Sequence, residues 1–187
     1  MQPVPALIEA LRETGSAFGR LGVDDLARPT CCTGWSVRQV LEHATGTTAK
    51  FAEFAAGHTD TPRGGDPPGT DPVRAFVATA GWARRCWADV DPGRTCRLPF
   101  GEFTGEQAAG INLFDLLTHY SDIAIAVGTG VGGPEEIWET ALAAARSVIG
   151  RGPRDLRHYD PERPVAAGAP AADRLRAYLG RTGSTVL

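Results

Sequence analysis

The stretch EQAAGINLFDLLTHYSDIAIAV, residues 106–127, decides the fold, because it is one of the two most helix-like stretches of the chain. Asp115 and His119 lie four residues apart, so both side chains share one face of a helix. Asp122 extends the same stripe by one turn. The neighbouring residues are apolar: Leu113, Leu116, Leu117, Ile123 and Ala126. Because polar groups are costly to bury without partners, the stripe indicates either a partly exposed ion pair or part of a metal site.

The rest of the chain also reads as helices joined by short links. Apolar residues recur at helical spacing over residues 4–21, 37–54, 72–88 and 134–149, and a short helix is expected at 172–180. Ser36 followed by Gln39 is a capping-box pattern, and Asp71 before Pro72 is a helix start. Residues 57–72 read as a loop, and residues 95–105 as a short extended piece. This pattern predicts an all-α protein, an antiparallel helix bundle with an extra short C-terminal helix.

Composition narrows the class of protein. The chain has 187 residues, which fits one domain over 1–187, and its net charge of −3 argues against nucleic acid and anionic membranes as partners. No apolar stretch is long enough to cross a membrane, and the N-terminus lacks the basic start of a signal peptide. We therefore expect a cytoplasmic protein, as a monomer or homodimer.

The four cysteines show no C-x-x-C pair, since Cys31 and Cys32 are adjacent and Cys86 and Cys96 are ten residues apart. This spacing argues against a structural zinc knuckle. We expect four reduced thiols that do not ligate a metal.

A competing motif is GTGVGG, residues 128–133, which matches the glycine pattern of dinucleotide-binding folds. The apolar DIAIAV before it resembles a strand, and Asp155 falls near the position that binds ribose. However, one strand and one helix cannot make a doubly wound sheet. We expect instead that Gly128 caps a helix and that a turn follows.

His43 lies in the other most helix-like stretch, SVRQVLEHATG, residues 36–46. A histidine from one helix and an Asp-x-x-x-His pair from another can form a two-histidine, one-carboxylate metal site with open positions. Zinc suits such a site, and nickel and iron are alternatives. The simpler interpretation is a core histidine and an ion pair. His58 and His158 lie in loops, and we expect both to be solvated.

The pattern CTGWSVRQVLEHATG, residues 32–46, together with Asp115, His119 and the SDIA segment at 121–124, resembles the DinB-like superfamily. Within this superfamily, the chain resembles the branch that contains the mycothiol-dependent maleylpyruvate isomerase N-terminal domain and actinobacterial metal-binding proteins. LPFGE at 98–102 and DRLRAYLGR at 173–181 also resemble this branch. The resemblance implies a four-helix core with a metal held by His43, Asp115 and His119.

Two residues depart from the family pattern. Asp115 stands where the isomerase has Glu, and Ser121 replaces the usual Trp, so we expect a wider or more polar wall next to the metal. The isomerase also has a C-terminal domain for which this chain is too short.

The resemblance implies a metal-dependent enzyme that uses mycothiol, or a similar small thiol, for transfer to or isomerisation of an electrophilic small molecule. Asp122 is the candidate catalytic residue, either orienting His119 or handling a proton. Two alternatives stay open. The protein could bind a metal or small molecule without turnover, or it could be a metal-free cyclase or isomerase of natural-product biosynthesis.

Overall fold

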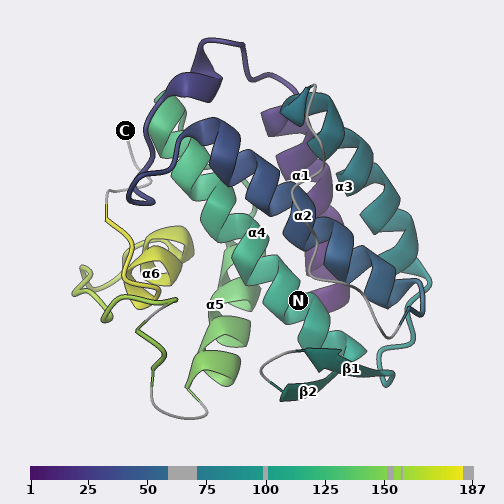
Figure 1. Cartoon of the computed structure of the whole chain (residues 1–187). Coiled ribbons are helices and arrows are strands. Elements are labelled where there is room, and N and C mark those ends of the chain that lie inside the picture. Colours follow the sequence, from purple (N-terminus) through teal and green to yellow (C-terminus); the bar gives the residue numbers. More distant parts are fainter. Residues whose placement is uncertain (59–70, 99–100, 151–153, 157, 183–187) are drawn as a thin grey trace.

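The protein is represented by a computed structural model, which describes residues 1–58, 71–98, 101–150, 154–156 and 158–182 (Figure 1). The described part is mostly helical, as predicted, with one small sheet. Its elements in chain order are α1 Pro3–Phe18, the 3₁₀ turn η1 Asp25–Ala27, α2 Val37–Ala55, α3 Pro72–Ala88, β1 Thr95–Leu98, β2 Gly101–Thr104, α4 Gly105–Val127, α5 Glu135–Ile149 and α6 Ala171–Tyr178.

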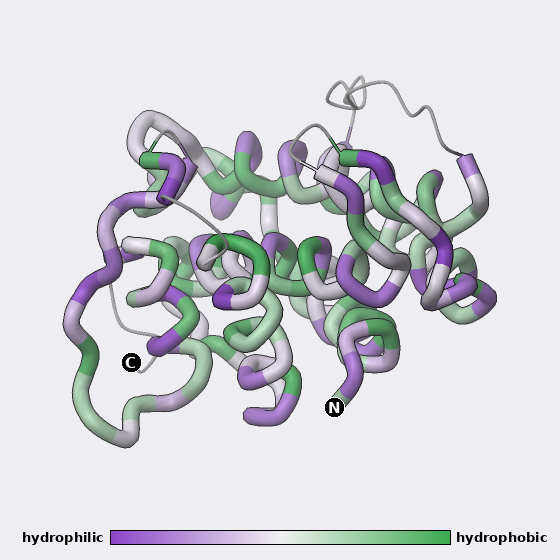
Figure 2. The backbone as a smooth tube through the Cα atoms, turned by 90° about the horizontal axis from the view of Figure 1, so that it is seen from below, coloured by the Kyte–Doolittle hydropathy of each residue, from purple (hydrophilic) through white to green (hydrophobic). Residues whose placement is uncertain are grey.

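Helices α1 to α4 form the predicted four-helix core. α1 packs against α3 and α4, and α2 packs against the same two helices, so each helix has two neighbours in the bundle. α5 lies on α4, and the short C-terminal α6 lies on α5 and α4 (Figure 1). Hydrophobic and hydrophilic residues alternate along the helices in Figure 2, as expected where one face of each helix is buried.

Helix α4 is the central helix of the bundle. Apart from Asp115, every residue from Ala108 to Ala124 is buried, so α4 has no solvent-facing side over this length. A helix buried all round must find partners inside the protein for its polar side chains. Those side chains include Asn112, Thr118, His119, Ser121 and Asp122.

Local sequence signals fix the starts of the helices. Gln39 Oε1 accepts a hydrogen bond from the backbone N–H of Ser36 at 2.9 Å, which confirms the predicted start of α2. Asp71 accepts hydrogen bonds from the backbone N–H groups of Val73 and Arg74 at 3.1 Å, which confirms the predicted start of α3.

The extended piece at 95–105, the end of α4 and the loop at 57–72 were also predicted from the sequence. The predicted extended piece is an antiparallel hairpin, in which Cys96 pairs with Phe103. Gly128 has a φ of 75° and ends α4 in the left-handed conformation, as expected, so DIAIAV is the end of a helix and not a strand. The predicted loop at 57–72 lies mostly outside the described residues.

None of the helices in the described ranges combines the length and apolar character needed to span a membrane.

Candidate metal centre

Two adjacent helices bring three potential ligands together. Asp115 and His119 project from the same face of α4, and His43 projects from α2. Their donor atoms all lie within 4.8 Å of one another. His119 Nε2 is 3.7 Å from Asp115 Oδ1, and the rings of His43 and His119 meet edge to face with centroids 4.8 Å apart.

Asp122 lies behind His119, on the side away from the other two donors. Its Oδ2 is 3.4 Å from His119 Nδ1, a charge contact whose geometry falls short of a hydrogen bond. Histidines that ligate metals commonly present the second ring nitrogen to a carboxylate, which fixes the tautomer and the ring orientation. The arrangement therefore leaves His119 Nε2 for the side where His43 and Asp115 lie.

The electrostatics of the site are dominated by buried carboxylates and arginines. Burial by itself lowers the pKa of His119, but the carboxylates of Asp122 and Asp115 outweigh it and raise that pKa. Burial by itself raises the pKa of Asp122, but His119 and Arg181 outweigh it and hold that pKa well below its usual range. Asp122 is therefore a permanent negative charge behind His119.

Arg176 of α6 makes the shorter of the two arginine contacts with that buried carboxylate. Its Nη1 donates to Asp122 Oδ1 at 2.8 Å and to Ser121 Oγ at 2.6 Å, and its side chain is only 1% exposed. Arg181 adds a second positive charge, with Nε 3.5 Å from Asp122 Oδ2. Ser121 thus accepts a hydrogen bond from Arg176 and is not among the residues that line the pocket described next, so the expected wider or more polar wall stays a prediction.

The three donors lie in a pocket of about 420 Å³. Its lining combines aromatic and aliphatic side chains with histidine, tyrosine and arginine: Cys32, Thr33, Trp35, His43, Phe114, Asp115, Thr118, His119, His158, Tyr159, Leu179 and Arg181. A larger hollow of about 590 Å³ lies over α4 and α5. Neither of the two converging donor groups found among the described residues lies in that hollow, so we place the candidate site in the smaller pocket.

The two loop histidines fall in different places. The side chain of His58 is 65% exposed and pairs with Glu53, as expected for a solvated residue. His158 is also mainly exposed and contacts Asp155 at 3.0 Å, but it lines the pocket that contains His119.

Sequence reasoning missed Arg176, Arg181 and Tyr159 as parts of the site. Burial raises the pKa of Tyr159 to about 12, so its hydroxyl stays protonated in the pocket. A signal for Arg176 was present, because an arginine on the buried side of a short helix needs a partner of opposite charge. Nothing local in the sequence identified Asp122 as that partner.

The donor set itself suits a divalent transition metal. Two imidazoles and one carboxylate leave coordination positions open, which is typical of sites that act on a ligand and not of closed structural sites. Asp115 is partly exposed and faces the pocket, so incoming molecules can reach the centre of the three donors.

Comparisons with known proteins agree with this architecture. The family model described as mycothiol maleylpyruvate isomerase N-terminal domain matches residues 7–124, which contain all three donors. Uncharacterised proteins from Mycobacterium tuberculosis strains CDC 1551 / Oshkosh and H37Rv are 33% identical over 188 residues, covering 97% of this chain and 99% of theirs.

Among solved structures, a mutant of the mycothiol-dependent maleylpyruvate isomerase has a similar fold, with a TM-score of 0.54 at 11% identity. The match covers 78% of this chain and 69% of that one. At this identity the likeness concerns the fold, whereas the family rests on the sequence match. The chain belongs to the mycothiol maleylpyruvate isomerase N-terminal domain family.

Proposed function

We propose that this protein is a divalent-metal-dependent enzyme that uses a low-molecular-weight thiol, mycothiol or a close analogue, for transfer to or isomerisation of an electrophilic small molecule. One observation carries the proposal: donor atoms of His43, Asp115 and His119 converge within 4.8 Å in a pocket that has room for small molecules. Family membership supports the choice of thiol. We propose zinc as the metal, since the ligand set suits it.

His43, Asp115 and His119 would hold the metal. A divalent ion held there would lower the pKa of a thiol bound to it and so supply the thiolate, the nucleophilic form. Asp122 does not line the pocket, and its low pKa keeps it ionised. We therefore assign Asp122 the role of orienting His119, in preference to proton handling.

The remaining walls of the pocket suit an electrophile with both apolar and charged parts. Trp35, Phe114 and Leu179 offer apolar surface, which excludes water from a bound molecule. Arg181 adds a positive charge that favours a substrate with an anionic group, and the Tyr159 hydroxyl can donate a hydrogen bond to it.

The test is conversion of electrophiles of different classes by the zinc-loaded protein with mycothiol present. Transfer to an epoxide or an aryl halide is followed as loss of mycothiol, and isomerisation of a cis-unsaturated keto acid, which regenerates the thiol, as the change of the keto acid itself. We expect turnover that needs both zinc and thiol, and that is abolished by His43→Ala. His58→Ala is the matched control, because this histidine is exposed and lies outside the pocket. Turnover without thiol, or turnover retained in His43→Ala, would contradict the proposal. Zinc binding with no turnover on any electrophile would favour a non-catalytic binding protein.

A further inference from the structure

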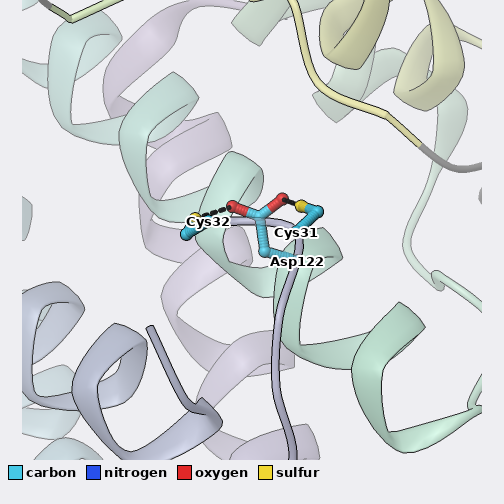
Figure 3. A group of neighbouring side chains, drawn as sticks. All are labelled: Cys31, Cys32 and Asp122. Carbon is cyan, nitrogen blue, oxygen red and sulfur yellow. Dashed lines mark hydrogen bonds between the residues drawn. The ribbon is translucent and has the colours of Figure 1, made fainter. Parts of the chain in front are cut away.

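A second group of donors meets at Asp122, the carboxylate beside His119, and one of its members, Cys32, also lines the pocket. Cys31 and Cys32 lie in the segment before α2 and point both thiols at one carboxylate (Figure 3). Cys31 Sγ is 3.0 Å from Asp122 Oδ1, and Cys32 Sγ is 3.3 Å from Asp122 Oδ2. The three donor atoms lie within 4.8 Å of one another, and both cysteines are free thiols.

The surroundings affect the two sulfurs differently: they lower the pKa of Cys31, whereas the Cys31 thiol, burial and Asp122 raise the pKa of Cys32 well above its usual range. Arg176 Nη2 is 3.7 Å from Cys31 Sγ, and Arg181 lies on the other oxygen of Asp122. The Cys32 thiol and, more weakly, Arg176 lower the pKa of Cys31, although burial and Asp122 oppose them. Guanidinium groups beside a thiol stabilise the thiolate, which is the form that ligates metals. Cys31 therefore gives up its proton more readily than Cys32, whose proton a bound cation would have to displace.

We propose that Cys31, Cys32 and Asp122 form a second metal site, which takes a thiophilic divalent cation such as Zn²⁺ or Cd²⁺. On binding, two S–H bonds break, two metal–sulfur bonds form, and two protons go to solvent, with no oxidation or reduction. One divalent ion replaces two protons, so the net charge of the cluster stays the same and the balance with Arg176 and Arg181 is kept. A monovalent or trivalent ion would disturb that balance.

The donor types select the class of ion. Thiolates prefer soft ions, whereas Mg²⁺ and Ca²⁺ prefer oxygen ligands. Without a metal, each thiol donates a hydrogen bond to one oxygen of Asp122. The bound ion would lie between the two sulfurs and this carboxylate and would replace both hydrogen bonds. The proposal differs from the expectation based on cysteine spacing because the third donor, Asp122, lies 90 positions beyond Cys32 in the chain.

Cadmium distinguishes this site from the histidine site, because cadmium–thiolate bonds give a charge-transfer absorption in the ultraviolet and imidazole or carboxylate ligands do not. We would titrate the full-length reduced protein with Cd²⁺ and record that absorption together with proton release. The expected result is a thiolate band that saturates at one ion per chain, with two protons released per ion in the thiolate phase. The band should remain in His43→Ala, which removes a ligand of the other site only.

The decisive variant is Cys31→Ser with Cys32→Ser. Each serine hydroxyl can still donate to Asp122, so the buried carboxylate keeps its partners and the fold is retained. This variant should lose the thiolate band, and Cys86→Ser, the matched control in α3, should keep it. If the double variant fails to fold, Cys32→Ser alone should lose most of the band. No thiolate band in the reduced wild type, or a band that persists in a folded Cys31/Cys32 variant, would overturn the proposal.

Discussion

Replacing Arg176 by Met tests how the C-terminal helix supports the site. Arg176 is 1% exposed and pairs with Asp122, which is fully buried, at 2.8 Å. Removing one partner of a buried ion pair typically costs about 3–5 kcal/mol, because the other charge is left uncompensated. Here Arg181 still faces Asp122 at 3.5 Å. We therefore expect the lower end, a loss of about 3 kcal/mol in the free energy of unfolding.

The metal-free protein is unfolded by urea, which gives the free energy of unfolding, and in a second series by heat, which gives the melting temperature. Both are followed by circular dichroism. Since each kcal/mol shifts the melting temperature by about 2–4 °C in a domain of this size, the melting temperature should fall by roughly 6–12 °C. Arg97→Met is the matched control, because the Arg97–Glu102 pair lies on the surface with side chains 79% and 63% exposed, and exposed pairs contribute little. If Arg176→Met is no less stable than Arg97→Met, the buried pair does not stabilise α6 against α4 and the reasoning is refuted.

Three further predictions concern the metal site and the bundle. Asp115→Ala should weaken zinc binding strongly. Asp122→Asn should still bind zinc, but with an affinity about 10–100-fold lower, as measured by calorimetry. An affinity in Asp122→Asn equal to that of the wild type would contradict the orienting role of Asp122. Zinc affinity should fall as the pH falls through the pKa of His119, because protons compete for Nε2. Burial opposes the raised pKa of His119 but does not cancel it, so the loss should begin nearer to neutral pH than for an ordinary histidine, and an affinity unchanged between about pH 5 and 8 would count against the site. Gly110→Ala should destabilise the bundle by about 1–3 kcal/mol in chemical unfolding, because the new Cβ would lie 2.9 Å from a side chain of α5. Gly130→Ala, which meets nothing within 4 Å, should not; similar stability of the two variants would show that α4 and α5 can move apart freely.

The elements of the fold were predictable because their signals are local. Helical spacing of apolar residues and the caps at Ser36 and Asp71 identified the helices from neighbouring residues alone. The Asp115–His119 pair was visible for the same reason, since residues four apart share a helix face. The hairpin was expected only as one extended piece, because no local pattern in the sequence relates Cys96 to its partner Phe103 across the two strands.

The environment of Asp122 could not be predicted, because its partners are distant in the chain. Cys31 precedes it by 91 positions, and Arg176 follows it by 54. These contacts depend on how α6 and the segment before α2 dock onto α4, which is a matter of tertiary packing. Spacing motifs report only ligands that are close in the sequence, so they gave no sign that the adjacent cysteines and the two arginines meet at Asp122.

The most direct test of the account is a crystal structure of the protein soaked with zinc, with anomalous diffraction measured at the zinc absorption edge. The account predicts an anomalous peak among His43, Asp115 and His119, at about 2.0–2.2 Å from the donor atom of each. It also predicts that this peak disappears in a folded His43→Ala variant. A wild-type crystal with no peak among these three residues would contradict the proposed metal centre, and with it the thiol-dependent activity.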